Sequence, residues 1–248
     1  MSGDPWDALA PLYASDDGSV EPPIGVADNI LLAWPPVIDF LISKLGTLRG
    51  KRILNYACGA GHFCRRLSML GAVPTGVDSS PAMIKAAHRV AHATTNLRLG
   101  GMETIPAEER FDAITCIMGL PFIAEPDALL RAWARHLEPK GVVAAVVFNP
   151  GFVRELLRTG HLFRDFDSSD RPRRGVLDLT GHHPLPVFIR YAEEYAYAFE
   201  THGLHLIYEA RPPFTADFLA EYPQTFPTQV PEFLVMGFRH QPAWPTPA

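Results

Sequence analysis

Short apolar runs alternate with amphipathic stretches through residues 51–149. In the amphipathic stretches the apolar residues recur at helical spacing, as Phe63, Leu67 and Leu70 do after the first run. This alternation is typical of parallel strands that are joined by crossover helices, so it predicts an α/β fold. The strands are expected at 52–57, 73–77, 97–99, 111–118 and 141–148.

The alternation of apolar runs and amphipathic stretches ends after the fifth apolar run. A stretch of mixed charge, aromatic residues and Gly/Pro breaks follows, and it is longer than an ordinary connection. We therefore expect residues 151–186 to form a substrate cap, inserted after the fifth strand. A further helical pattern comes next, and apolar runs near 204–209 and 233–239 would complete a sheet of seven strands.

Two helical patterns precede the first strand, at about 6–13 and 29–45. The second contains Pro35-Pro36, which predicts an interruption there. Helices ahead of such a sheet can fold over the carboxyl ends of its strands, where open α/β sheets bind ligands. The predicted division is an N-terminal helical lid at 1–50, a cofactor-binding core at 51–150, the substrate cap at 151–186, the completion of the sheet at 187–240 and a Pro-rich tail at 241–248.

Composition narrows the classes of partner. The chain has 248 residues, of which 47% are hydrophobic and 20% charged, and its formal net charge of −5 argues against a nucleic-acid partner. No apolar run approaches the roughly 20 residues of a membrane helix, and the first residues lack the pattern of a signal peptide. Three cysteines without a CxxC pair favour reduced thiols over disulfides or zinc. We therefore expect a cytoplasmic protein without membrane or nucleic-acid partners, and assign no oligomeric state.

Gly59 and Gly61 follow the first predicted strand and open a helix. Such a turn favours glycine where the backbone takes unusual angles and where a ligand approaches closely. The spacing departs from GxGxxG, whose third position is Cys64 here, so a dinucleotide site is less favoured and a plain tight turn is the alternative. Asp78 ends the second strand, where its carboxylate could accept hydrogen bonds from two ribose hydroxyls. Alternatively, Asp78 is an acid at the start of the next helix.

Taken together, these motifs resemble those of class I S-adenosylmethionine-dependent methyltransferases, particularly the small-molecule branch that includes the ubiquinone-biosynthesis enzymes. The stretch 57–61 (Ala-Cys-Gly-Ala-Gly) is similar to the family's first motif and 75–80 (Thr-Gly-Val-Asp-Ser-Ser) to its ribose motif, while 111–112 and 137–142 match later ones. The resemblance covers about 52–149. It implies a Rossmann-like, doubly wound, mostly parallel seven-stranded sheet that binds S-adenosylmethionine and releases S-adenosylhomocysteine. No pair of carboxylates with a neighbouring Asn follows the fourth strand, so we expect no metal.

The resemblance also assigns residues to the cofactor. The family usually has an acid where Asn55 stands, a third glycine where Ala57 stands, and often an acid at Gly101 that binds adenine. With glycine at that position, adenine would be held by the backbone of Met102, by Glu103 or by apolar packing. The implied cofactor-binding residues are Tyr13, Asn55, Ala57, Gly59, Gly61, Asp78, Ser79, Met83, Met102, Glu103 and Cys116.

The implied function is methyl transfer to O, N or C of a small aromatic or heterocyclic metabolite. In-line placement supplies most of the catalysis, and a base helps where the acceptor must lose a proton. His182 and His183 in the predicted cap and His161 at its start are candidates for that role; ordinary surface histidines are the alternative. Two rival functions stay open: a methyltransferase-fold cyclase or lyase that does not methylate, and a cofactor-binding regulatory subunit.

Overall fold

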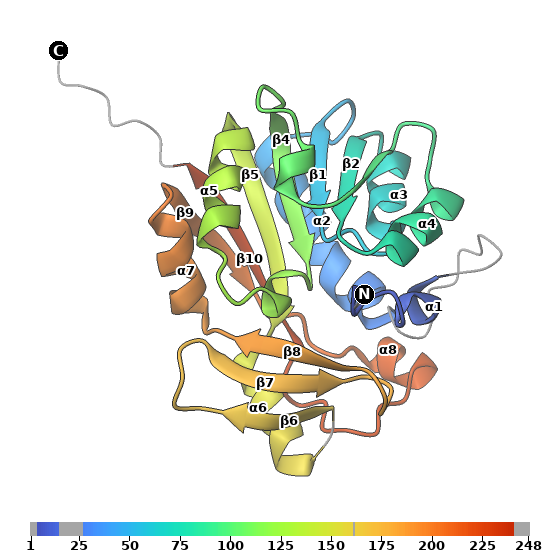
Figure 1. Cartoon of the computed structure of the whole chain (residues 1–248), viewed down its shortest axis with the longest axis vertical. Coiled ribbons are helices and arrows are strands. Elements are labelled where there is room, and N and C mark those ends of the chain that lie inside the picture. Colours follow the sequence, from blue (N-terminus) through green and yellow to red (C-terminus); the bar gives the residue numbers. More distant parts are fainter. Residues whose placement is uncertain (1–3, 15–26, 161, 241–248) are drawn as a thin grey trace.

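The computed structural model describes residues 4–14, 27–160 and 162–240. At its centre lies a sheet of seven strands in the order β3-β2-β1-β4-β5-β10-β9 (Figure 1). The first five strands pair in parallel, and β10 runs antiparallel to both β5 and β9. The predicted doubly wound, mostly parallel α/β sheet is confirmed. Its strands are β1 (Arg52–Tyr56), β2 (Val73–Asp78), β3 (Asn96–Leu99), β4 (Phe111–Ile117), β5 (Leu137–Phe148), β9 (Leu204–Ala210) and β10 (Phe233–His240).

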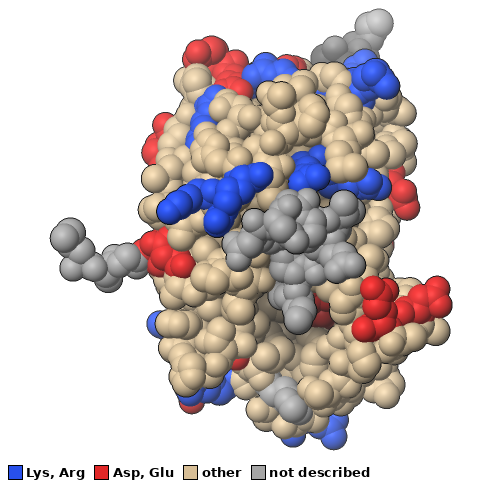
Figure 2. Space-filling view, turned by 90° about the vertical axis from the view of Figure 1, so that its right-hand side faces the viewer, with Lys and Arg blue, Asp and Glu red and all other residues tan. Residues whose placement is uncertain are grey.

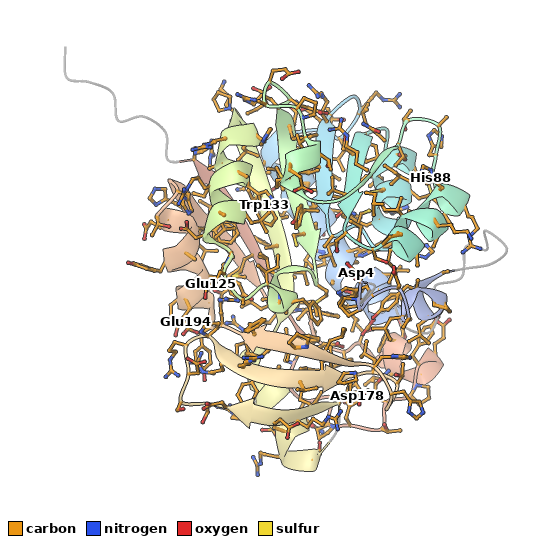
Figure 3. The ribbon with its side chains drawn as sticks, viewed as in Figure 1. Asp4, His88, Glu125, Trp133, Asp178 and Glu194 are labelled. Carbon is orange, nitrogen blue, oxygen red and sulfur yellow. The ribbon has the colours of Figure 1, made fainter. Side chains whose placement is uncertain are left out.

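Helices cover both faces of this sheet. On one face, α2 (Trp34–Leu45) and α3 (His62–Met69) bury Phe40 and Phe63 against it. On the other face, α5 (Asp127–His136) and α7 (Ala192–Glu200) bury Trp133 and Phe199, and Figure 3 labels Trp133 on α5. Because both faces are covered, ligands can reach the sheet only at its edges.

The strand order places a ligand crevice at one of these edges. β1 lies between β2 and β4, so the chain leaves β1 toward one side of the sheet and later returns on the other. Such a reversal opens a crevice at the carboxyl ends of the two central strands. The glycine turn at 57–61 directly follows β1, which puts the first sequence motif at this crevice.

The cap consists of α6 (Pro150–Thr159) and a separate three-stranded antiparallel sheet, seen below the main sheet in Figure 1. Its strands are β6 (Phe163–Asp167), β7 (Arg173–Asp178) and β8 (Pro184–Ile189). The sequence predicted a cap here but no strands in it, because breaks and alternating charges obscure their short apolar pattern. β8 also extends three residues beyond the predicted boundary at 186.

Two arginines connect the cap to the core. Arg173 Nη1 donates a hydrogen bond of 2.7 Å to Glu194 Oε2, and Figure 3 labels Glu194 at the start of α7. Arg190 donates to the carbonyl oxygens of Ile123 and Ala124, which follow the 3₁₀ helix η4 (Leu120–Phe122). Both side chains are nearly buried, so the position of the cap is defined relative to the carboxyl edge of the sheet.

The N-terminal lid contains the short helix α1 (Ala10–Tyr13) and the π-helix η2 (Asn29–Ala33), which runs directly into α2. The helical stretch at 29–45 changes from π-helix to α-helix between Ala33 and Trp34, next to the interruption that was predicted at Pro35-Pro36, and the chain stays helical across it. Both prolines lie in the first turn of α2, where proline is tolerated because that turn contributes few backbone donors to the helix. The predicted tail at 241–248 lies outside the described residues.

Gly61 provides a test of how α3 packs against α4 (Pro81–Val90). Its φ is +81°, and a Cβ there would lie 2.8 Å from Ala87 Cβ. We expect Gly61→Ala to lower the free energy of unfolding by about 2 to 4 kcal/mol in chemical denaturation, because overpacking adds to left-handed strain. Gly46→Ala is the matched control: its φ is +75° with no atom within 4 Å, so only the strain of about 1–2 kcal/mol applies. Equal losses in the two variants would contradict the packing role.

Candidate functional site

A cavity of about 450 Å³ lies at the carboxyl edge of the sheet, between the sheet, the lid and the cap. From the side shown in Figure 2, the surface is hollowed between the upper part of the molecule and the cap below it. The turns after β1, β2 and β4 form one end of the cavity, and residues of η2, the cap and 224–232 form the other. The cavity therefore occupies the crevice that the strand order predicts.

Asp78 joins the two turns at the first end. Its Oδ2 accepts a hydrogen bond of 2.8 Å from Gly59 N, and its Oδ1 accepts one of 3.0 Å from Ser80 N. Burial raises the pKa of Asp78, and these two N–H donors oppose that rise. A Cβ at Gly59 would meet no atom within 4 Å, so this backbone borders open space. Asp78 thus presents a buried carboxylate beside an exposed stretch of backbone.

The lid is fastened to the same turns by its own polar groups. Asp4 Oδ2 accepts from Ser79 Oγ at 2.7 Å, and Figure 3 labels Asp4 below the ends of the strands. Asp7 Oδ1 accepts from Ser80 Oγ at 2.6 Å. His62 Nε2 lies 2.7 Å from the carbonyl oxygen of Tyr13 and donates to it. The lid therefore closes this end of the cavity by contacts on both the β1 and β2 turns.

The other end of the cavity is mainly apolar. Lid and wall meet where the ring of Trp6 packs edge-on against Phe122, with centroids 4.7 Å apart. The apolar side chains that line this end are Trp34, Phe122, Ile123, Phe148, Phe152, Leu162, Phe163, Leu177, Leu179 and Phe226. Most of them come from the cap or from segments packed against it, so the cap forms the wall of a second, apolar compartment.

Four polar residues interrupt this apolar wall: Asp28, Asn29, Gln224 and Glu232. Glu232 precedes β10, and its carbonyl oxygen accepts a hydrogen bond of 2.7 Å from Asn149 N at the end of β5. The Glu232 side chain is only 9% exposed and hydrogen-bonds to the carboxyl group of Asp28. Residues from opposite ends of the chain thus form one carboxyl pair, in which Glu232 is buried and Asp28 is half-buried.

Burial raises the pKa of Glu232 well above its ordinary value, and the neighbouring Asp28 raises it further. Burial also raises the pKa of Asp28. The raised pKa favours the protonated form of Glu232, which can donate a hydrogen bond to Asp28. Tyr13 faces the pair, and burial together with the two carboxyls raises the pKa of its hydroxyl. By contrast, burial lowers the pKa of His62, which favours the neutral ring.

Comparison with known proteins identifies the family. A family model described as a methyltransferase domain matches residues 53–141. A ubiquinone biosynthesis O-methyltransferase from Xanthomonas oryzae pv. oryzae is 31% identical in an alignment 182 positions long that covers 66% of this chain and 72% of the relative. The chain belongs to the S-adenosylmethionine-dependent methyltransferases. A second relative of the same description, from Xanthomonas campestris pv. campestris, is 30% identical over the same shares of both chains.

Solved methyltransferase structures have the same fold. A putative S-adenosylmethionine-dependent methyltransferase from Listeria monocytogenes superposes with a TM-score of 0.65 at 18% identity, over 85% of this chain and 99% of that one. Magnesium protoporphyrin IX methyltransferase from Synechocystis, with bound S-adenosylhomocysteine, gives a TM-score of 0.63 at 15% identity, over 95% and 94%. At these identities the similarity concerns the fold.

The residues at the β1 and β2 turns fit S-adenosylmethionine, the cofactor of this family. Asp78 offers a buried acceptor for ribose hydroxyls, and Gly59 leaves its backbone open to the cavity. The described lining residues include no lysine or arginine, which suits a positively charged sulfonium. In the described part of the chain, no cluster of three or more His, Cys, Asp or Glu could hold a metal ion. No helix within 4–14, 27–160 or 162–240 has the length and apolarity to span a membrane.

Seven of the eleven residues that the sequence assigned to the cofactor line the cavity of this methyltransferase. Asn55, which stands at a usual acid position, is fixed there because its Oδ1 accepts from Thr115 Oγ1 at 3.1 Å. The seven are Tyr13, Asn55, Ala57, Gly59, Asp78, Ser79 and Met83.

The other four do not line it. Gly61 contacts Ala87 and serves helix packing. Cys116 is fully buried against the α5 and α7 layer, where burial raises its pKa to about 12, and Met102 packs against the same layer. Glu103 is exposed and accepts a 2.6 Å hydrogen bond from Gly101 N. The short 3₁₀ helix η3 (Met102–Thr104) thus leaves the backbone of Gly100 and Gly101 at the cavity wall.

The structure does not bring the candidate histidines into the cavity. His182 and His183 are exposed in the turn between β7 and β8, and neither lines the cavity. Hairpin turns run over the surface because their backbone groups need water, which explains this placement. His161 lies outside the described residues. Sequence reasoning instead missed Asp28 and Glu232, since nothing local links a lid residue to a residue before the last strand.

The Asp78 carboxylate can be tested directly. Asp78→Ala should weaken binding of S-adenosylhomocysteine by about 1.5 to 3 kcal/mol, because a charged hydrogen-bond acceptor for the ribose is lost. Isothermal titration calorimetry measures the change, with the exposed Glu125→Ala as a control that should bind like the wild type. Unchanged affinity in Asp78→Ala would remove this carboxylate from the cofactor site.

The carboxyl pair predicts a pH-dependent stability. Because Glu232 and Asp28 have raised pKa values in the folded state, their contribution is fully present below the ordinary carboxyl pKa of about 4 and is lost as pH rises through the raised values. Glu232→Gln removes one of these groups. Its free energy of unfolding relative to wild type should therefore rise by more than about 1 kcal/mol between pH 5 and 8. The exposed Glu125→Gln should show a flat difference, and a flat difference in Glu232→Gln would argue against the buried pair.

Proposed function

We propose that this methyltransferase methylates an O, N or C atom of a small aromatic or heterocyclic molecule, held in the apolar end of the cavity. The continuity of the cavity carries the proposal: one cavity runs from Asp78 and the glycine turn to the aromatic side chains under the cap. A cofactor at the first end would therefore share one continuous cavity with an apolar acceptor at the second.

When bound, S-adenosylmethionine supplies an activated methyl group, whose carbon forms a bond to the acceptor atom as its bond to sulfur breaks, leaving a thioether. The residues of this chain have the task of alignment. Asp78 and the backbone at Gly59 fix the donor, while rings such as Phe148 and Phe152 hold a flat acceptor in a defined plane. Such positioning can supply most of the rate acceleration of a group transfer.

The lid and the cap also exclude water. The lid reaches from Ser79 and Ser80 to Phe122, and so covers the cavity near the point where the two compartments meet. The cap closes the far end with a cluster that includes Phe163, Leu177 and Val187. We assign the donor to the core at 51–150 together with the lid, and the acceptor to the cap together with the segment that ends at Glu232.

The relatives support an aromatic acceptor. Their description as ubiquinone biosynthesis O-methyltransferases names a small molecule and transfer to oxygen. The apolar compartment of this chain suits an apolar ring. Its four polar residues are treated separately below. We therefore propose the same class of acceptor, a small cyclic metabolite, without carrying over the relatives' substrate.

The test is transfer of a labelled methyl group. The protein is incubated with S-adenosylmethionine carrying a deuterated methyl group and with fractions of a small-metabolite extract, and mass spectrometry follows the products. We expect a new ring-containing product heavier by the labelled methyl group, formed in step with S-adenosylhomocysteine and reduced at least tenfold in Asp78→Ala. Formation of S-adenosylhomocysteine with no labelled product, or labelled macromolecules only, would refute the proposal.

A further inference from the structure

The carboxyl pair of Asp28 and Glu232 lies in the acceptor end of the cavity, where Asp28 Oδ1 also accepts a hydrogen bond of 2.7 Å from Asn29 N at the start of η2. That cap needs only one of the two acids. Asp28 is the residue before η2, and Glu232 is the residue before β10. Both line the cavity, and Glu232 is hydrogen-bonded to Asp28 with its side chain nearly out of contact with solvent. Placing a buried carboxyl beside a second, half-buried one is costly, which favours a use for the pair beside a ligand cavity.

The polar atoms around the pair are mostly hydrogen-bond acceptors. Asn29 Oδ1 is buried and has no hydrogen-bond partner among the described residues, although Asn29 lines the same cavity. Gln224 already donates from Nε2 to the carbonyl oxygen of Tyr222 at 2.8 Å, which leaves its own amide oxygen as an acceptor. An unpartnered buried acceptor beside two carboxyls indicates a ligand that donates hydrogen bonds.

The charge of the cavity points the same way. Its described lining residues include Asp28, Asp78 and Glu232 but neither lysine nor arginine. His62 is the one described lining residue that could become a cation, and its Nε2 is engaged by the carbonyl of Tyr13 while burial lowers its pKa. An anionic acceptor would have no cation to pair with here. A cationic one would find carboxyl groups and aromatic rings such as Trp34.

We propose that Asp28 and Glu232 select the acceptor by binding a cationic nitrogen, either an ammonium group or a protonated nitrogen heterocycle, carried on an apolar body. This inference rests on the methyl-transfer function proposed above and adds the charge of its substrate. The two residues act in recognition, and the atom that receives the methyl group is not specified by them.

Binding of the cation to both carboxylates would release a proton. In the free protein a hydrogen bond between the two carboxyls requires one bridging proton, and the Tyr13 hydroxyl is the other titratable group that faces them. An ammonium N–H takes the place of that bridge by donating to both carboxylates, and the bridging proton passes to the solvent. Binding of an amine should therefore release protons, whereas a neutral molecule of the same shape should release none.

The experiment compares amines with alcohols of the same skeleton. The probes are benzylamine against benzyl alcohol, 2-phenylethylamine against 2-phenylethanol, and tryptamine against tryptophol, with phenylacetate as an anion. Each is titrated calorimetrically into the full chain saturated with S-adenosylhomocysteine, at pH 7 in two buffers of different ionisation enthalpy. We expect at least one amine to bind ten or more times tighter than its alcohol and to release protons, and phenylacetate to bind more weakly than 2-phenylethanol.

Two isosteric variants and a control complete the test. In Asp28→Asn and in Glu232→Gln the amine-to-alcohol ratio should fall at least fivefold and the proton release should disappear. Both substitutions keep the size and shape of the side chain and remove its charge. Thermal unfolding checks that both variants are folded. Glu125→Gln makes the same change on the surface, as Figure 3 shows by its position on the loop before α5, and should keep the wild-type ratio.

The outcomes separate this inference from the proposed function. If S-adenosylhomocysteine binds but no amine binds tighter than its alcohol, or the preference survives in both variants, the carboxyl pair does not select a cation and the inference is overturned. The inference is also overturned if S-adenosylhomocysteine binds but none of the amines does. If S-adenosylhomocysteine itself does not bind, or a metabolite extract yields no methylated product, it is the proposed function that fails.

Discussion

The site depends first on one buried carboxylate. Asp78 accepts hydrogen bonds from Gly59 N and Ser80 N, and so holds together the turns that follow β1 and β2. Those turns carry the open backbone at Gly59 and the helix start at Ser80, whose side chain caps α4 and binds Asp7 of the lid. Without that connection, neither the donor end of the cavity nor the anchor of the lid would have a defined geometry.

The sequence predicted the parts whose signals are local. Five parallel strands follow from buried apolar runs, and the glycine turn with Asp78 follows from the fixed order of strand, turn, helix and acid. Gly61 belongs to the same motif, yet its role is contact with Ala87, because a glycine permits close packing as readily as ligand approach. The motif therefore identified a segment that lines one end of the cavity, but it did not separate the two uses of its glycines.

The parts that escaped prediction depend on distant pairing. Asp28 and Glu232 meet because the lid folds over the strand ends and β10 pairs with β5. The residues next to them in the sequence carry no pattern that predicts either contact. His182 and His183, in contrast, were conspicuous in sequence but lie in an exposed turn. The end of the cavity that we assign to the acceptor is thus built from long-range contacts, and the cost of its carboxyl pair in stability at neutral pH is consistent with a functional purpose.

The central claim is that one cavity aligns a donor on Asp78 with an acceptor beside Glu232. A crystal structure of the protein with S-adenosylhomocysteine tests it most directly. The account predicts the ribose hydroxyls within hydrogen-bond distance of Asp78 and the sulfur facing the apolar compartment between Phe148 and Glu232. Electron density for the nucleoside elsewhere, or a sulfur turned away from that compartment with Asp78 unengaged, would contradict it.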